Sequence, residues 1–181
     1  MAIVANDILF RLSVKTGAAG DTTAGTPAGS LGKYISTTAI TDATLHNLFD
    51  VVTGDENAAS DVEYRCFFVL NNHGSLTWEN VVAWLSAEVA GGCSAAIAVD
   101  DIAASPKGQA GAQAYEAATE STDPSAALGD WSTATSKGTG VAIGDIAAGY
   151  CRAIWVRRTA ANTVAVDNDG VTISVEGDTA A

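Results

Sequence analysis

Apolar and polar side chains alternate along most of this chain, and the clearest alternation spans residues 61–71. The even-numbered positions of this segment form one face, which is mainly apolar. The odd-numbered positions form a second face that mixes charged and apolar side chains. A period of two is typical of a β-strand, because successive side chains of an extended chain point to opposite sides. The pattern therefore predicts a strand covered on one face and partly covered on the other.

Similar alternation recurs between turn-forming segments rich in small residues. Residues 72–75 form a natural turn, which predicts that segments 61–71 and 76–88 pair as a hairpin. Strands do not alternate with helices, so a parallel sheet is not expected. We predict a single domain over residues 1–181, with an all-β fold that is an antiparallel β-sandwich or jelly-roll. The predicted strands are residues 7–15, 33–37, 61–71, 76–88, 94–99, 140–146, 150–158 and 171–176.

Residues 41–53 differ from the rest, because their apolar side chains recur at helical spacing. Thr41 or Asp42 is placed to cap a helix here, and Gly54 is placed to end it. We therefore predict one short helix that lies across a sheet or closes an end of it.

Two segments, residues 16–30 and 103–140, are rich in Gly, Ala, Ser and Thr and poor in large apolar side chains. Such segments are typical of surface loops. A loop as long as 103–140 is uncommon inside a compact domain, so we expect it to be functional or supported by a partner. We predict surface or partner-contacting loops at both places, with one strand near 109–117 in the longer one.

The net charge is −12, from 21 acidic residues against 9 lysines and arginines. Nucleic-acid binding needs basic groups that displace phosphate counterions, so direct binding to DNA or RNA is not expected. The odd number of cysteines, together with the lack of a recognisable signal peptide, favours free thiols in a reducing cytosol. No window approaches the roughly 20 apolar residues of a membrane span, so no membrane association is expected. The three cysteines are Cys66, Cys93 and Cys151.

Motifs of known chemistry do not emerge from the sequence. The cysteines and the two histidines lack the short paired spacing of a zinc site. Residues 167–170 are similar to the opening of a calcium loop, but the glycine comes at the fourth position, so a tight turn is the favoured interpretation. No serine lies in a nucleophile elbow, and no phosphate-binding loop is present. We expect no enzyme activity, no catalytic residues, no cofactor and no metal.

Four residues are candidates for an interface. Trp131 stands among small residues, where an aromatic side chain is a plausible anchor for a partner; equally open is that it folds back over its own sandwich. Arg152, Arg157 and Arg158 concentrate positive charge on one predicted strand of an otherwise acidic chain. They are candidates for pairing with carboxylates of the same chain, which is slightly favoured, or with a neighbouring subunit.

Three segments together, residues 54–72, 152–158 and 170–178, resemble small structural proteins of tailed-bacteriophage virions, of the decoration or cement kind. The resemblance implies a non-enzymatic virion protein that is assembled in the host cytoplasm. It implies a capsid decoration protein that docks on the lattice of the major capsid protein, or contacts other virion proteins, as a homo-oligomer. A neck, tail or baseplate component is the alternative within the virion, and a glycan-binding module of the virion is a further one.

Overall fold

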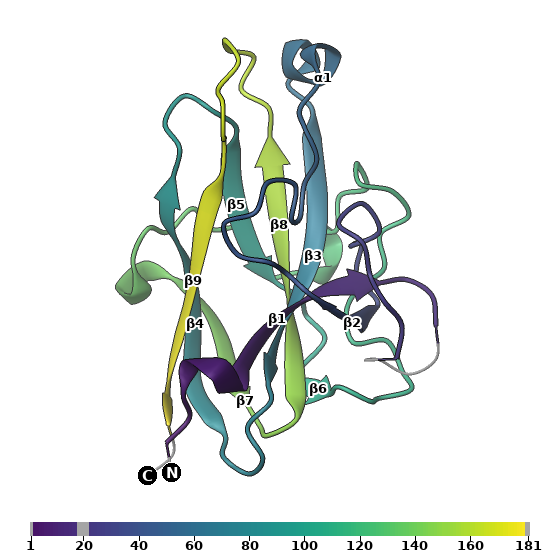
Figure 1. Cartoon of the computed structure of the whole chain (residues 1–181), viewed down its shortest axis with the longest axis vertical. Helices are drawn as coiled ribbons and strands as arrows, with labels where there is room; N and C mark the ends of the chain where they lie inside the picture. The colour runs from purple at the N-terminus through teal and green to yellow at the C-terminus, as the bar shows by residue number, and fades with distance from the viewer. Residues whose placement is uncertain (1, 18–21, 180–181) are drawn as a thin grey trace.

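The computed structural model describes residues 2–17 and 22–179, and it contains two stacked antiparallel sheets (Figure 1). The larger sheet has the strand order β2-β1-β3-β8-β5, with the short strand β6 beside β8, and the smaller sheet has the order β7-β4-β9. The described chain contains one short α-helix. The predicted all-β sandwich is therefore confirmed. The strands are β1 (Ile8–Val14), β2 (Tyr34–Ala39), β3 (Val62–Asn71), β4 (Trp78–Glu88), β5 (Ser94–Val99), β6 (Ser105–Pro106), β7 (Val141–Ile146), β8 (Tyr150–Thr159) and β9 (Val171–Thr179).

The strand with the clearest sequence alternation, β3, lies at the centre of the larger sheet and is buried on both faces. Phe67 and Val69 point into the core between the two sheets. Cys66, Phe68 and Leu70 point to the opposite face, where they join a second apolar core. The predicted division of β3 into two faces is confirmed. Since both faces are covered, the larger sheet is the middle layer of the molecule.

After β3, the chain passes repeatedly between the two sheets. From β3 onwards, β3, β5, β6 and β8 belong to the larger sheet, whereas β4, β7 and β9 belong to the smaller one. The predicted hairpin of β3 with β4 is therefore wrong. The turn between them is held as a corner, because the Asn71 side chain donates to the carbonyls of Leu76 and Ile146, both at 2.9 Å. His73 Nδ1 also accepts from the Leu76 amide at 3.0 Å. This corner carries the chain into the other layer.

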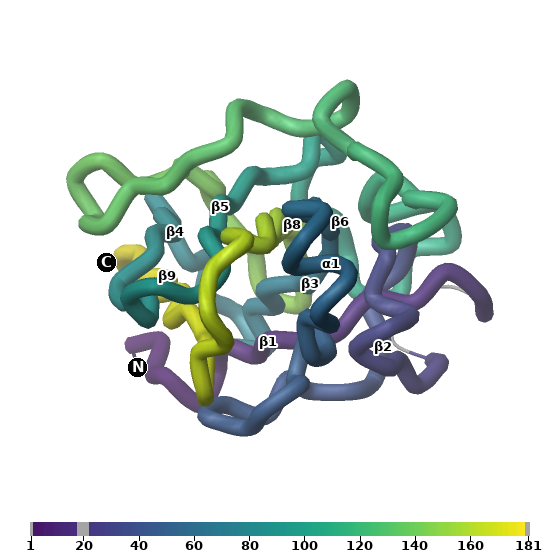
Figure 2. The backbone as a smooth tube through the Cα atoms, turned by 90° about the horizontal axis from the view of Figure 1, so that it is seen from above, coloured from purple at the N-terminus to yellow at the C-terminus, as the bar shows by residue number. Residues whose placement is uncertain are grey.

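The second core lies on the outer face of the larger sheet and is covered by two segments, called the covering segments: the chain just after the predicted loop 16–30 and part of the predicted loop 103–140. Leu31, Ala114 and Ala117 are buried against this face. Isolated β-bridges, such as Gly32 with Glu116, tie the segments to each other and to the sheet. The strand predicted near residues 109–117 does not form, and the segment makes only the isolated bridge at Glu116. The segment between β5 and β7 runs along one side of the molecule (Figure 2). Residues 18–21 of the first loop lie outside the described part.

The predicted helix at residues 41–53 is wrong in position. The helix α1 (Gly54–Ala59) begins where the prediction ended, because Thr53 caps it. The Thr53 hydroxyl accepts from the Glu56 amide at 3.3 Å, and the Glu56 carboxylate accepts from the Thr53 amide at 2.6 Å. In the segment before it, Ala43 and His46 adopt positive φ angles, which interrupts a right-handed helix. The helical spacing there reflects turns that bury Leu48 in the core between the sheets.

Gly32 marks the closest approach between the covering segments and the sheet, and it yields a first prediction. Its φ is +89°, and a Cβ atom there would lie 1.9 Å from the Tyr115 carbonyl oxygen and 2.8 Å from the Trp155 ring. We expect Gly32→Ala to lower the free energy of unfolding by about 2–3 kcal/mol, through backbone strain and overpacking. Urea denaturation measures this, with Gly108→Ala as the control, because a Cβ there would meet nothing within 4 Å. Equal stability of the two variants would contradict the described packing.

Candidate functional site

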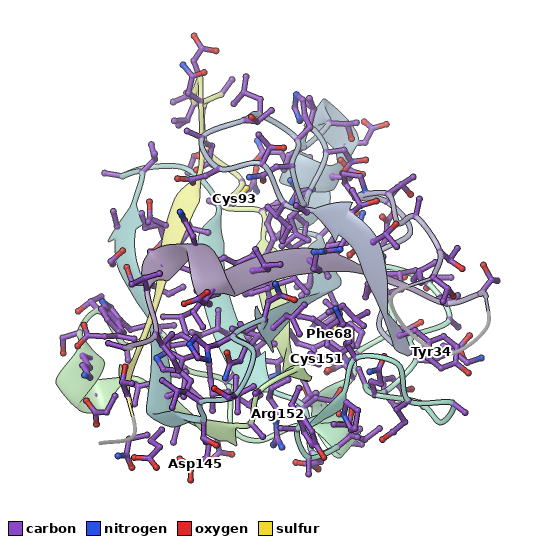
Figure 3. All side chains as sticks on the ribbon, turned by 60° about the horizontal axis from the view of Figure 1, so that its bottom comes forward. Tyr34, Phe68, Cys93, Asp145, Cys151 and Arg152 are labelled. Carbon is purple, nitrogen blue, oxygen red and sulfur yellow. The ribbon has the colours of Figure 1, made fainter. Side chains whose placement is uncertain are left out.

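The three arginines of β8 are placed on different sides of the larger sheet. Arg157 lies over Trp131 near the outer face, and Arg158 lies near the core between the sheets beside Glu63. Arg152 lies towards the other end of the strand, where Figure 3 shows it below Cys151. Successive side chains of a strand alternate in direction, which accounts for the separation of Arg157 from Arg158. The sequence-predicted cluster is therefore three separate sites, of which Trp131 joins one.

The first site is a stack of Arg157, Trp131 and Tyr64. The Arg157 guanidinium carbon lies 5.1 Å from the centroid of the Trp131 ring, and the Tyr64 ring lies 5.7 Å from it, centroid to centroid. The Trp131 indole N–H donates to the Ser125 hydroxyl at 2.7 Å, and Ser125 in turn donates to Asp123. Cation–π and aromatic contacts of this kind stabilise a fixed ring orientation. Trp131 thus folds back over its own sandwich while remaining partly exposed.

Neighbouring groups shift the pKa values of Asp123 and Tyr64 at this stack. Hydrogen bonding from Ser125 lowers the pKa of Asp123, and a hydrogen bond from Tyr64 and the charge of Arg157 act in the same direction. Burial raises the pKa of the Tyr64 hydroxyl, and the nearby Asp123 carboxylate adds to the effect. Both shifts favour an ionised Asp123 and a neutral Tyr64 at neutral pH. The first site therefore presents an aromatic ring, a guanidinium and a carboxylate together.

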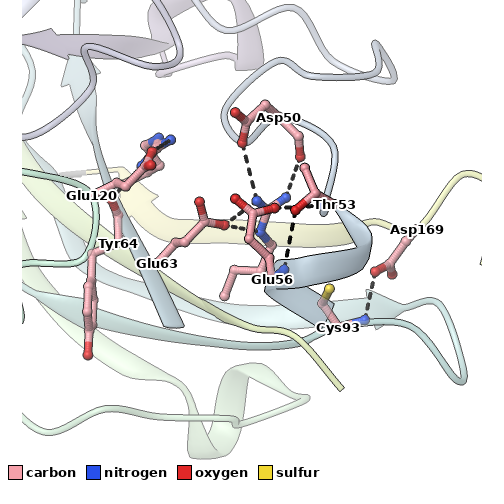
Figure 4. A network of polar contacts seen from close by, with 10 residues as sticks. Asp50, Thr53, Glu56, Glu63, Tyr64, Cys93, Glu120 and Asp169 are labelled. Atoms are coloured by element: carbon pink, nitrogen blue, oxygen red, sulfur yellow. Dashed lines mark hydrogen bonds and ion pairs between the residues drawn. The ribbon is translucent and has the colours of Figure 1, made fainter. Parts of the chain in front are cut away.

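The second site is a charged network at the α1 end of the core between the sheets (Figure 4). Arg158 forms a close ion pair with Glu63 and a longer one with Asp50, at 3.3 Å. It also donates to the Asp50 carbonyl at 2.5 Å and lies 4.7 Å from the centre of the Phe49 ring. The side chains of Arg158 and Glu63 are 13% and 10% exposed, so water screens this pair weakly. Arg158 therefore pairs within its own chain.

A second arginine, Arg65, completes this network and was not predicted as a site residue. Its side chain is fully buried and pairs with Glu120 at 2.5 Å. It lies 5.4 Å from the Phe49 ring, so two guanidinium groups contact the same aromatic ring. The amide of Tyr64 donates to the Glu120 carbonyl at 2.7 Å, which attaches the covering segment to the edge of β3. The sequence signal for Arg65 was a charged side chain in the middle of a largely apolar strand, but nothing in the sequence pointed to Glu120 as its partner.

The third site joins Arg152 to the backbone of Asp100, whose own carboxylate is buried. Arg152 donates to the Asp100 carbonyl oxygen at 2.8 Å. The Asp100 carboxylate, only 1% exposed, accepts from the Trp155 indole N–H at 2.9 Å and from the amides of Tyr115 and Ile102 at 2.8 and 2.9 Å. Burial raises the pKa of Asp100, although these hydrogen bonds oppose the shift. Burial also lowers the pKa of Arg152. Asp100 thus fixes the covering segment to the sheet.

Cys66 and Cys151 lie in the second apolar core on the outer face of the larger sheet, whereas Cys93 lies outside it. Cys66, Cys93 and Cys151 form no disulfide with one another, and Figure 3 shows Cys93 far from Cys151. Burial raises the pKa of Cys93 to about 11, with the neighbouring Asp169 adding to it, so this thiol is protonated at neutral pH. The Asp169 carboxylate accepts from the Cys93 amide at 2.7 Å, which joins the loop before β9 to the loop before β5. Among residues 2–17 and 22–179, no group of three or more metal-ligating side chains converges.

Comparisons with known proteins give no relative. No family model, no curated protein and no solved structure matches the chain. In the described residues, no helix has the length and apolar character needed to cross a membrane.

Proposed function

We propose that the chain is a non-enzymatic structural protein of a tailed-phage virion, and within the virion a capsid decoration protein that docks on the major capsid lattice. The proposal rests on the resemblance of three segments to small virion proteins. These segments form α1 with β3, most of β8, and most of β9. In the fold, β3 and β8 pair over nine residues at the centre of the larger sheet. The structural observation that supports the proposal is the β3–β8 pair. It is buried on both faces, and its charged residues attach the covering segments; we call this pair the platform.

The sites found on β8 support a structural role in a specific way. Arg158 joins the segment before α1 to the sheet, and Arg65 joins the covering segment that contains Glu120. Arg157 holds Trp131 against Tyr64. Each contact fixes a surface segment on the platform, which gives a rigid shape to present to neighbouring subunits. A rigid surface binds a lattice with a smaller entropic cost than a mobile one. Many modest contacts repeated over a lattice then stabilise the shell together.

Counting copies in purified particles tests the proposal. We expect hundreds of copies of this chain per particle, measured by quantitative mass spectrometry against the major capsid protein. A few to tens of copies would instead support the neck, tail or baseplate alternative, which remains a prediction of the sequence. Absence of the chain from purified particles would refute both. Localisation in the virion after assembly in the host cytoplasm and homo-oligomer formation belong to the same proposal.

The glycan-binding alternative receives no added support from the geometry. A sugar stacks on an open aromatic face, and the Trp131 ring already contacts Tyr64 and the Arg157 guanidinium. A glycan array with the purified protein tests this alternative directly. Binding that is lost in Trp131→Ala and kept in Trp131→Phe would favour it over the decoration role.

A further inference from the structure

The two long sides of the sandwich differ in how they are closed. On one side, the Ile97 amide of β5 donates to Ser132, and the Leu85 amide of β4 donates to Ala134, both at 2.9 Å. A single segment thus spans from the larger sheet to the smaller one. On the opposite side, β9 is the edge strand of the smaller sheet, and the N-terminal turn Ala5–Asp7 lies beside it (Figure 1). We call this second side, on which no strand of the described chain pairs with β9, the open side of the sandwich.

The backbone of β9 has one row of polar groups directed towards the open side. The Thr172 carbonyl accepts from Ser86 of β4 at 3.3 Å, and the Gly170 carbonyl accepts from the Val89 amide at 3.0 Å. The even-numbered residues of β9 therefore direct their backbone groups to β4. Backbone direction alternates along an antiparallel strand, so Ile173 and Val175 direct theirs to the open side. Such an edge is a template for a further strand.

A groove of about 210 Å³ lies next to this edge. Phe10, Trp78 and Val175 contribute apolar walls, and Phe10 and Val175 are partly exposed although they pack against the core between the sheets. Val4, which also lines the groove, is 58% exposed. The groove has about the size of one large apolar side chain. A strand placed along β9 would direct alternate side chains towards it.

The outward face of the same edge is acidic. Glu79 of β4 and Asp178 of β9 are register partners, so two carboxylates lie opposite each other on adjacent strands. Like charges in this position are destabilising. Asp178 accepts from the Asn80 side chain at 3.2 Å, and the neighbouring Glu176 pairs with the exposed Lys137 at 2.6 Å. A strand placed along β9 would direct its other side chains towards Glu176 and Asp178.

We propose that the open edge of β9 is a docking site for an extended segment of another virion protein, in which apolar side chains alternate with lysine or arginine. The segment adds to the smaller sheet as a strand, places an apolar side chain in the groove, and brings its basic side chains to the acidic face. Main-chain hydrogen bonds supply affinity in this mode of recognition, and the alternating side chains supply specificity. The source of the segment rests on the proposed function, but its chemistry comes from β9 alone.

A second copy of this chain is not the occupant that the charges favour. Two copies paired through β9 would bring two sets of the carboxylates Glu176 and Asp178 to one interface. Each copy also carries a net charge of −12. Charge complementarity therefore selects a basic partner.

Fluorescence anisotropy with a labelled eight-residue peptide tests the proposal, using lysine and valine in strict alternation. A peptide of the same composition, with four lysines followed by four valines, is the matched control for nonspecific attraction. We expect the alternating peptide to bind at physiological salt. The block peptide should bind about tenfold more weakly, because as a strand it cannot place valines on one face and lysines on the other. Equal binding of the two peptides would overturn the proposal.

Two double variants locate the binding. We expect Glu176→Gln with Asp178→Asn to weaken binding of the alternating peptide about tenfold. Asp55→Asn with Asp130→Asn removes the same charge from exposed positions elsewhere, and we expect less than about a twofold change. Equal weakening by both double variants would show attraction to the net charge and would overturn the docking site.

Amide hydrogen exchange identifies the edge itself. In the free protein, we expect the amides of Ile173 and Val175 to exchange faster than those of Ser174 and Glu176, which face β4. The alternating peptide should slow the fast pair selectively. If the peptide slowed the exchange of other amides in place of this pair, the proposal would be overturned. A dimer of the free protein that protects the same two amides would overturn it as well. These measurements need no virion, so their failure would leave the copy-number test of the proposed function unaffected.

Discussion

Replacing Asp100 with alanine is expected to lower the free energy of unfolding by about 4 kcal/mol. The Asp100 carboxylate accepts three hydrogen bonds, from the Trp155 indole and from the amides of Tyr115 and Ile102. Alanine would leave these donors without their acceptor in a buried place, and each unsatisfied donor costs about 1–3 kcal/mol. For a chain of this size the midpoint of thermal unfolding should fall by about 10 °C. Calorimetry and urea denaturation measure both quantities.

The neighbouring residue provides the control for this prediction. Asp101 is exposed, and its replacement by alanine changes the same charge one position along the chain. We expect Asp101→Ala to change stability by less than about 0.5 kcal/mol, as most surface substitutions do. If both variants lost equal stability, the three hydrogen bonds of Asp100 would not be the source of the effect.

The pH dependence of the Asp100 effect has a defined sign. Burial raises the pKa of this carboxyl in the folded protein above its ordinary value of 3.8. The folded state therefore retains the proton to a higher pH than the unfolded chain does. The stabilisation linked to this proton is complete below pH 3.8 and is lost as the pH rises through the folded pKa. We expect the stability difference between the wild type and Asp100→Ala to be larger at pH 3.5 than at pH 7, because the wild type gains the stabilisation from this bound proton only at low pH.

Replacing Glu120 with alanine has the second large expected effect, a loss of about 2–3 kcal/mol. Its partner Arg65 is fully buried, so removal of the carboxylate leaves a buried charge without its partner. The magnitude is lower than for a wholly buried pair, because the Glu120 side chain is 46% exposed. The Arg65 side chain also keeps its bond to the Tyr64 carbonyl, at 3.2 Å. Denaturation in urea at low and high salt measures the loss, which should depend little on salt.

Glu116 provides a matched control in the same covering segment. It pairs with Lys33 at 2.8 Å, but both side chains are substantially exposed. Exposed ion pairs contribute about 0.2–1 kcal/mol and are screened by salt. We therefore expect Glu116→Ala to cost less than about 1 kcal/mol and to lose its effect at high salt. Similar costs for the two glutamate variants would mean that the burial of Arg65 does not determine the strength of its ion pair.

Sequence reasoning predicted individual strands better than it predicted their partners. The alternation in β3 identified both of its faces, because each face is buried and burial imposes a period of two. The partner of a strand depends on contacts between segments that are far apart in the sequence. The turn after β3 gave no sign that the chain crosses there from one sheet to the other. The apolar spacing before α1 was misleading, because turns at Ala43 and His46 bury the same side chains without a helix.

The sequence singled out the candidate interface residues, but the structure pairs them with residues of distant segments. Trp131 contacts Tyr64, and Arg158 contacts Glu63 and Asp50. Nothing local in the sequence specifies such pairs. Asp100 was missed as the central acceptor of its network, although its signal was available. It is an acidic residue that directly follows a buried strand, and such a position calls for buried donors.

The repeated passage of the chain between the two sheets has a consequence for the synthesis of the protein. β8 pairs with β3, and β9 pairs with β4. Neither sheet can therefore be completed before the last third of the chain has been synthesised. In nascent chains that end before β8, β3 could pair only with β1, and much of its apolar surface would stay exposed. Folding must therefore be largely post-translational and slow, since loops of many tens of residues close before the sheets form. Chaperone capacity and the rate of chain release would then set the supply of native protein in the cell.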